Sequence, residues 1–395
     1  MESAKTFQDT EFYGLKQVKT DAAQGLGTMI RAINTDSQEL ELRSKRFGDK
    51  EIEIVAAFNI PHLLKLDLSG NSFGKEGALT LAKNTTWKNL KSLDISGCTI
   101  EDEGAANLAT NTTWSLLSSL EVACIRIGAK GAAGLAANTT WANLQILDLR
   151  GNHIGNGGAG YLATNNSWTR LHTLNLSTNK IGSEGMALLA LNKSWTNLQS
   201  LNLTDNLIGE EGAAGLAKNR SWANLQTLCL TGCKIGDAGA KSIAMNPTWT
   251  NLQFIYLLHN NIGDEGAAGL AANKNWTKLF ALQLYDNRIG AAGVEKLAAN
   301  MVWTNLNKLD LASNRLDSEA VEKLAANTSW VNLRNLVLDG NDIKDEGAEK
   351  LVQNKSWKKL QKIGLRDTNI WDKGKRALFE FQKKFVDLEF EFWSY

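Results

Sequence analysis

Proline and cysteine are both scarce in this chain of 395 residues, which has 2 prolines and 4 cysteines. So few cysteines exclude a disulfide-stapled fold. Length alone predicts two or three domains. The only prolines, Pro61 and Pro247, do not form a Pro-rich linker that would separate such domains. Residues 1–20 lack the apolar segment of a Sec signal peptide, and no apolar run is long enough to span a membrane. We expect a cytoplasmic protein without a membrane partner.

The chain also lacks an excess of charge of either sign. Lysine and arginine together number 43 and aspartate and glutamate 42, so the formal net charge is +1. A dedicated nucleic-acid-binding protein normally has a basic excess. The balance therefore predicts no nucleic-acid partner, while a hydrophobic content of 43% predicts a packed core.

Tryptophan is abundant, with 13 residues, and 11 of these recur at a constant spacing of 27 residues. A fixed period in this range is typical of repeat proteins, in which stacked units bury a continuous core. Every unit has the tryptophan, so we expect a ladder of indoles inside the molecule rather than an aromatic binding stripe. The column comprises Trp87, Trp114, Trp141, Trp168, Trp195, Trp222, Trp249, Trp276, Trp303, Trp330 and Trp357.

The same period carries the pattern L-x-x-L-x-L-x-x-N-x-I, which is the leucine-rich-repeat signature. Its Leu-x-Leu segment predicts a short strand whose leucines face the interior. A segment such as GEEGAAGLA follows and predicts a short helix with acidic residues at its start. The sequence thus predicts an α/β fold: a right-handed leucine-rich-repeat solenoid, or horseshoe, with a parallel concave sheet, short convex helices and 27-residue units.

One solenoid accounts for nearly the whole chain. Residues 63–386 contain twelve units, residues 1–62 are expected to form an N-terminal cap with an irregular first repeat, and residues 387–395 a C-terminal capping strand. Such caps cover the apolar ends of a stack. Trp393 and Tyr395 are expected to close the C-terminal end, and residues 1–38 are alternatively an export signal.

Three smaller features of the unit also predict structure. The asparagine after the strand is expected to turn inward and bond the main chain, with an irregularity where Ile125 replaces it. The asparagine after the helix, such as Asn84, is expected to end the helix in the left-handed conformation. A glycine in the helix, present in 11 of 12 units and replaced by Ala320 in the other, indicates close approach between neighbouring elements.

The unit resembles the ribonuclease-inhibitor-like class of leucine-rich repeats, and the segment from Ile208 to Ala217 resembles the GALA-type repeats of bacterial effectors. The resemblance covers residues 40–392 and implies a protein–protein interaction scaffold, in a bacterial effector that acts on host proteins and is exported without a Sec signal. GALA effectors carry an F-box that opens with Leu-Pro, and this chain has no Leu-Pro pair. The role of ubiquitin-ligase substrate adaptor is therefore kept as an alternative.

No phosphate-binding loop, dinucleotide fingerprint or zinc-ligand spacing occurs. We therefore expect no enzyme, no catalytic residue, no metal and no cofactor. Cys229 is expected to face the concave surface and to be reactive, but no histidine shares its unit. Ran GTPase-activating proteins share the ribonuclease-inhibitor-like fold, so GTPase regulation is a second alternative, with Arg150, Arg288 and Arg366 near the loops after strands.

Positions that vary between units indicate where a partner binds, because the constant positions are explained by the fold. The outward-facing residue in the middle of the strand is acidic in the first four units. Stacking brings these like charges close together, where they would attract a basic surface. This acidic row comprises Asp67, Asp94, Glu121 and Asp148.

Large side chains occupy outward strand positions in the unit that begins at Leu252 and in the next one. Exposed apolar residues of this size are typical of interface centres. We predict that a protein partner binds there, with Phe254, Tyr256 and Tyr285 as anchors, and we expect the chain itself to be a monomer. This aromatic patch comprises Phe254, Tyr256, Leu258, His259, Gln283, Tyr285 and Asp286.

Overall fold

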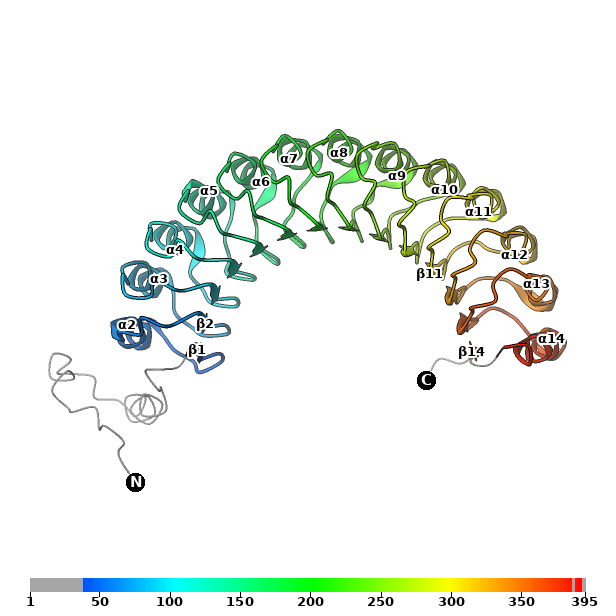
Figure 1. The fold of residues 1–395 in the computed structure, drawn as a ribbon, viewed down its shortest axis with the longest axis horizontal. Helices are drawn as coiled ribbons and strands as arrows, with labels where there is room; N and C mark the ends of the chain where they lie inside the picture. The colour runs from blue at the N-terminus through cyan, green and yellow to red at the C-terminus, as the bar shows by residue number, and fades with distance from the viewer. Residues whose placement is uncertain (1–37, 386–387, 393–395) are drawn as a thin grey trace, which may run out of the picture.

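The computed structural model describes residues 38–385 and 388–392, which form a curved solenoid (Figure 1). Fourteen strands of this part of the chain lie in one parallel sheet, in the order in which they occur in the sequence. The sheet lines the inner side of the arch and the helices lie along its outer side (Figure 1). The predicted leucine-rich-repeat solenoid of the α/β class is therefore confirmed.

Each strand has three residues, and the middle residue is buried in all but the last one. The strands are β1 Glu39–Glu41, β2 Lys65–Asp67, β3 Ser92–Asp94, β4 Ser119–Glu121, β5 Ile146–Asp148, β6 Thr173–Asn175, β7 Ser200–Asn202, β8 Thr227–Cys229, β9 Phe254–Tyr256, β10 Ala281–Gln283, β11 Lys308–Asp310, β12 Asn335–Val337, β13 Lys362–Gly364 and β14 Glu389–Glu391.

A short helix follows every strand from β1 to β13 and carries the chain back toward the next strand. The helices are α2 Asp49–Ala57, α3 Lys75–Ala82, α4 Glu101–Leu108, α5 Ala129–Ala137, α6 Gly155–Ala163, α7 Ser183–Leu189, α8 Gly209–Leu216, α9 Gly236–Ala244, α10 Asp264–Ala271, α11 Ala291–Ala298, α12 Ser318–Ala325, α13 Lys344–Leu351 and α14 Asp372–Gln382.

The two ends of the sheet differ slightly from its middle. Glu39 pairs with Lys65, a spacing of 26 residues, whereas later strands pair at 27, and Phe390 on β14 lies opposite Ile363. Among the described residues, no helix is long and apolar enough to cross a membrane. The expected N-terminal export signal, up to residue 37, and the closing residues Trp393 and Tyr395 lie outside the described residues.

The predicted tryptophan ladder is confirmed, because all eleven side chains of the column are at most 1% exposed. Ring centroids lie 6.5 Å apart between Trp168 and Trp195, and 6.2 Å apart between Trp195 and Trp222. The Trp87 indole donates to the Phe58 carbonyl at 3.1 Å, but nine other indole nitrogens of the column have no hydrogen-bond partner. Since an unpaired buried donor costs free energy, the indoles stabilise the solenoid through their packing.

The asparagine after each strand turns inward and joins two units, as Asn206 illustrates. Its Nδ2 donates to the Leu176 carbonyl of the preceding unit at 2.9 Å and to the Leu203 carbonyl of its own unit at 2.8 Å. Its Oδ1 accepts from the main-chain nitrogens of Asn179 at 3.1 Å and Ile181 at 2.9 Å. One buried amide thus satisfies four main-chain groups that have no other partner in the bend.

The irregularity expected at Ile125 is absent, and that prediction is wrong. Strand pairing continues in register from β3 to β5, and Ile125 is fully buried. Without an asparagine oxygen to meet it, the Cys98 main-chain nitrogen donates to the Ile95 carbonyl of its own unit at 3.3 Å. The apolar side chain fills the interior, so loss of one rung leaves the backbone course unchanged.

The left-handed conformation predicted for the asparagine after each helix is also wrong. Asn138 has φ −74° and ψ 117°, and no residue of its column has a positive φ. Its Nδ2 donates to the carbonyls of Ala109 and Asn111 in the preceding unit, at 2.7 and 3.0 Å. Its Oδ1 accepts from the nitrogens of Thr140 and Trp141, at 2.8 and 3.1 Å. This column is a second asparagine ladder, which holds the loop before each tryptophan.

The helix glycine does mark a close approach, to a carboxylate of the preceding helix in units such as that of Gly131 and to its backbone in others, as where Gly158 faces Ala129. Asp102 Oδ1 accepts from the Gly131 nitrogen at 2.8 Å, and a Cβ on Gly131 would lie 2.7 Å from that oxygen. Ala320 is the exception, and the preceding helix has Ala291 in place of the carboxylate. Here the helix is capped from its own unit, because Asp317 Oδ1 accepts from the Ala320 nitrogen at 2.9 Å. Where the preceding helix offers such an aspartate, as Asp102 and Asp264 do, the helix N-terminus is capped from the neighbouring unit, which couples the two units.

Candidate partner-binding surface

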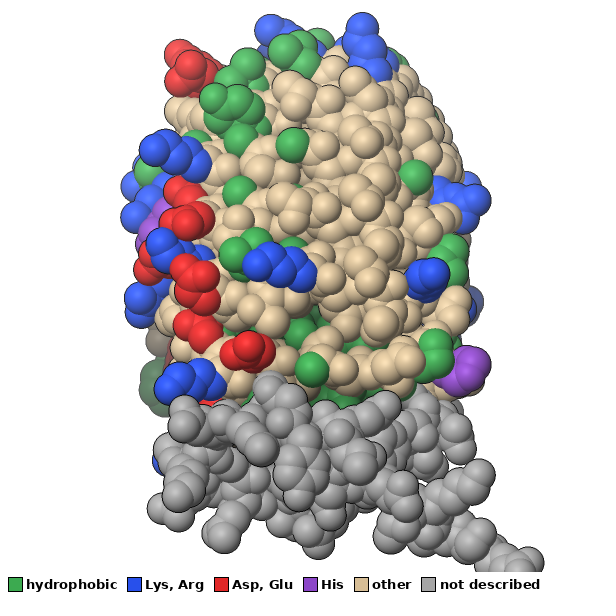
Figure 2. Space-filling view, turned by 90° about the vertical axis from the view of Figure 1, so that its left-hand side faces the viewer, with side chains coloured by type: hydrophobic (Ala, Val, Ile, Leu, Met, Phe, Trp, Pro, Cys, Tyr) green, Lys and Arg blue, Asp and Glu red, His purple; other side chains and the backbone are tan. Residues whose placement is uncertain are grey.

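The outer face over the N-terminal helices has little that varies in chemistry. Figure 2 shows acidic side chains gathered along one edge of this face and Lys and Arg side chains on both edges, while much of the remaining surface is neither charged nor hydrophobic. Hydrophobic side chains come to this surface only in small separate groups. The concave sheet is different, because its outward positions hold side chains particular to each unit.

Strand pairing brings the acidic row together, with one carboxylate on each strand from β2 to β5 and each lying opposite the next. Neighbouring strands lie about 4.8 Å apart, so the charges repel one another. Glu41 on β1 lies opposite Asp67 and extends the row by one strand, and Lys65 Nζ lies 3.2 Å from Glu41 Oε1. The lysine offsets the charge at that end.

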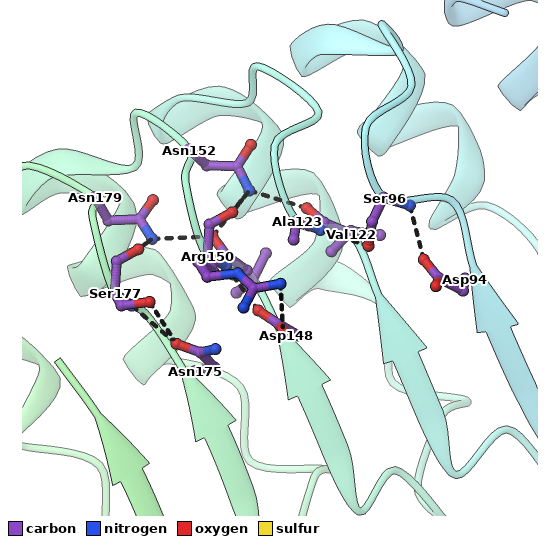
Figure 3. A network of polar contacts seen from close by, with 11 residues as sticks. Asp94, Ser96, Val122, Ala123, Asp148, Arg150, Asn152, Asn175, Ser177 and Asn179 are labelled. Atoms are coloured by element: carbon purple, nitrogen blue, oxygen red, sulfur yellow. Dashed lines mark hydrogen bonds and ion pairs between the residues drawn. The ribbon is translucent and has the colours of Figure 1, made fainter. Parts of the chain in front are cut away.

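Several units use a side-chain oxygen acceptor at this column, but the fold requires no charge there, and Cys229 and Val337 occupy it without such an oxygen. Asp94 Oδ1 accepts from the Ser96 nitrogen at 2.8 Å and closes the bend after the strand (Figure 3). Asn175 makes the same contact with the Ser177 nitrogen at 3.1 Å without a charge (Figure 3). The negative charges of the acidic row therefore exceed what the backbone requires.

Ionisation of a carboxyl group is least favourable in the middle of the acidic row. Burial raises the pKa of Asp94 and of Glu121, and the neighbouring carboxylates raise both further. At the far end, Arg150 Nη2 lies 3.9 Å from Asp148 Oδ2 (Figure 3). Cations thus neutralise the two ends of the row and leave its centre acidic.

The aromatic patch lies on β9, on β10 and on the bends that follow them, with Tyr256 directly opposite Gln283. Its side chains rest on the sheet with part of their surface open to solvent. Phe254, Tyr256, Leu258, Gln283 and Tyr285 are half-buried, and His259 and Asp286 are exposed. Burial raises the pKa of the Tyr256 phenol, so this hydroxyl stays protonated and available as a hydrogen-bond donor at neutral pH.

His259, Tyr285 and Asp286 form a small contact group at the edge of the patch. The His259 and Tyr285 rings meet edge to face with centroids 5.1 Å apart, and His259 Nδ1 lies 2.5 Å from Asp286 Oδ2. His259 and Asp286 have φ of 55° and 49°, in a column where five other units have glycine. A side chain in this left-handed conformation costs about 1 kcal/mol, but five further units of the column also have one, so this conformation belongs to the repeat and not to the patch alone.

Phe280 belongs to the same surface and was not predicted. Its ring centroid lies 5.6 Å from that of Phe254, and the side chain is 42% exposed. Phe280 stands one residue before its strand, where the neighbouring units have Gln253 and Asn307. Comparing this column along the units, as was done for the strand positions, would have found it.

The structure keeps the acidic row and the aromatic patch apart. The row ends on β5 and the patch begins on β9, with β6 to β8 between them. Asp148 and Tyr256 are therefore about 19 Å apart along the sheet, at about 4.8 Å per strand. Only an extended partner surface would contact both.

Cys229 lies between the acidic row and the aromatic patch, and the prediction that it is reactive is wrong. It is half-buried, and burial raises the pKa of its thiol to about 11. The thiolate is the reactive form, and almost none is present at neutral pH. Cys98 and Cys233 are fully buried, as expected, and burial raises the pKa of each to about 12.

The three arginines considered for GTPase regulation follow strands β5, β10 and β13 and do not converge. Arg150 contacts Asp148 as described, and Arg366 Nη2 lies 3.3 Å from Glu391 Oε1. Within residues 38–385 and 388–392, no group of three or more histidine, cysteine, aspartate or glutamate side chains is placed to hold a metal ion.

The sequence model of the Leucine Rich repeat family matches nine segments, which together cover about half of the chain. The chain belongs to this leucine-rich repeat family. The matched segments are residues 59–82, 88–109, 142–163, 169–190, 196–217, 223–244, 250–271, 304–325 and 331–352.

Comparison with solved structures gives matches at low identity, and the first of the two described next shows the same fold. An internalin from Listeria monocytogenes is 20% identical, with a TM-score of 0.63 over 95% of each chain. A leucine-rich repeat protein of Leptospira interrogans is 19% identical, with a TM-score of 0.49 over 91% of this chain and 96% of that chain. No curated protein matches the sequence. The leucine-rich repeat fold is consistent with a protein–protein interaction scaffold, and it does not identify the partner.

Proposed function

We propose that this leucine-rich repeat protein is a scaffold, and no enzyme, that recognises a protein partner on its concave face. The aromatic patch is the anchor. The observation that carries the proposal is that bulky, half-buried side chains occupy outward strand positions of two neighbouring units, where most other units have small or short polar residues. Aromatic side chains that are partly buried before binding are typical centres of interfaces.

The acidic row is proposed to attract the partner and not to anchor it. The row is too far from the aromatic patch for one small region of a partner to contact both. Its charges attract a basic surface during approach, which raises the association rate more than the final affinity. Added salt screens such attraction over about 10 Å at 0.1 M. We therefore expect partner association to slow with salt, and dissociation to change little.

The sequence resemblance supports a narrower form of the proposal. The segment from Ile208 to Ala217, which resembles GALA-type repeats, favours a bacterial effector that acts on host proteins. GTPase regulation and the ubiquitin-ligase adaptor role are the alternatives, and each of them would also require binding of a protein partner.

The test compares the concave and convex faces with matched double variants. Partners are captured with the wild-type protein, purified, and titrated by calorimetry against Tyr256→Ala/Tyr285→Ala and against Tyr161→Ala/Leu188→Ala. Tyr161 and Leu188 are exposed on neighbouring convex helices, α6 and α7, so the control removes similar side chains.

For a true partner, we expect the concave variant to raise Kd at least tenfold, because interface anchors contribute about 2 kcal/mol or more. The convex control should leave Kd unchanged, with circular dichroism showing that both variants are folded. Partners that bind the concave variant normally and fail to bind the control would contradict the proposal.

A further inference from the structure

Trp371 stands apart from the tryptophan ladder, because its side chain is 69% exposed. It lies in the loop between β13 and α14, directly before the helix. Eight other units have glycine at this position, from Gly74 to Gly290. The repeat frame therefore does not call for a large aromatic side chain here.

The main chain at Trp371 meets the only requirement that the fold sets at this position. Its nitrogen donates to Asp345 Oδ1 at 2.7 Å, just as the Gly290 nitrogen donates to Asp264 Oδ1 at 2.7 Å. The backbone is extended, with φ −109° and ψ −156°, which any residue adopts. The indole thus adds exposed apolar surface that the repeat frame does not require at this position.

The indole borders an open hollow of about 580 Å³ whose other lining groups are mostly charged. Lys344 Nζ lies 2.9 Å from Asp342 Oδ2, and Asn369 Nδ2 donates to Asp342 Oδ1 at 2.8 Å. The Lys344 and Asn369 side chains of the lining therefore both bind the Asp342 carboxylate. Of the two acidic residues of the lining, Asp345 accepts from the Trp371 main-chain nitrogen and Glu346 is the next residue along α13. The hollow is lined by Lys344, Asp345, Glu346, Asn369 and Trp371.

We propose that this hollow is a second binding site, which takes an arginine side chain of a protein partner. A guanidinium is planar and weakly hydrated, so it stacks on an indole face while its N–H groups donate to carboxylates. The Trp371 ring offers the face, and Glu346 and the second oxygen of Asp345 are the acceptors. The site lies on the edge formed by the strand-to-helix loops and does not depend on the aromatic patch.

The test follows tryptophan indole N–H signals by NMR while N-acetyl-arginine methylamide is added to the full chain. The Trp371 signal is assigned by its loss in Trp371→Phe. We expect this signal to shift and saturate, whereas the signals of the eleven ladder indoles stay in place. The matched probe is the citrulline analogue, which has nearly the same shape and no charge and should produce no saturable shift.

A pair of variants tests the carboxylate. Glu346→Gln is expected to weaken binding of the arginine probe at least threefold, whereas Glu319→Gln, at the equivalent position of α12, should leave it unchanged. An equal response to citrulline, no response to arginine, or unaltered binding by Glu346→Gln would overturn the proposal. A response to cellobiose without one to arginine would identify a carbohydrate site instead.

Discussion

The interior and the concave surface of this solenoid are built from the same repeating unit, yet one is nearly constant and the other varies. Trp222 has a tryptophan before and after it in its column, whereas Tyr256 has Cys229 and Gln283 beside it. An interior side chain contacts its counterparts in two neighbouring units, so changing it disturbs two interfaces. An outward side chain contacts mainly solvent, and this freedom leaves room for recognition.

The largest effect is expected when a tryptophan of the interior and a tryptophan of the surface are each replaced and the losses of stability are compared. Trp222→Ala should lower the free energy of unfolding by about 3–5 kcal/mol, because it leaves a cavity in the ladder. Trp371→Ala should change it by about 0.5 kcal/mol or less. Urea denaturation followed by circular dichroism measures both midpoints. Equal losses would show that the ladder is not the stabilising feature that we describe.

A second pair of variants tests the contact between helices. Gly131→Ala should destabilise by about 1–3 kcal/mol, although alanine favours helices, because the new Cβ would lie against Asp102 Oδ1. Ala320→Gly should cost only about 1 kcal/mol, the difference in helix propensity. Thermal unfolding separates the two. Stabilisation by Gly131→Ala would mean that the carboxylate moves aside at no cost.

The smallest effect concerns the acidic row on the surface. Asp94→Asn should stabilise the protein by about 0.5 kcal/mol at pH 7, since it removes repulsion and keeps the acceptor oxygen. Burial raises the pKa of Asp94 in the folded state, so its ionisation costs stability as the pH rises through that pKa. The gain should therefore be present at neutral pH and disappear below the unfolded pKa of aspartate, about 3.9.

The reverse substitution sharpens this comparison. Asn175→Asp would add a fifth carboxylate next to Asp148, and it should destabilise at pH 7 and have no effect at pH 3. Unfolding curves at the two pH values measure both variants. A stability gain for Asn175→Asp at pH 7 would contradict the repulsion inferred for the row.

Sequence reasoning succeeded for two of the columns that recur at a fixed spacing. The tryptophan ladder and the inward Asn206 column followed from the period alone, since stacked units of equal length place equivalent residues side by side. It failed where the role of a residue depends on the preceding unit. Asn138 was expected to end a helix by its backbone, yet it bonds the carbonyls of the preceding unit.

The candidate surfaces show the same division. Alternation along the strands predicted which strand positions face outward, but Asp67 of the acidic row is only 8% exposed. It did not reveal Phe280, because the residue lies just before its strand, or the low reactivity of Cys229, which comes from burial by its surroundings. Trp371 falls outside the 27-residue column in the sequence, but only its exposure in the structure marked it as a candidate site.

By itself, the sequence determined the repeat, its length, the parallel sheet and the inward-facing columns, because these depend on periodicity and on the burial of apolar side chains. Only the tertiary structure decided which groups satisfy each other across units. It showed that Asp102 caps the helix of the next unit and that Ala320 is tolerated beside Ala291. Such contacts join residues more than 25 positions apart, and their geometry depends on how two neighbouring units pack.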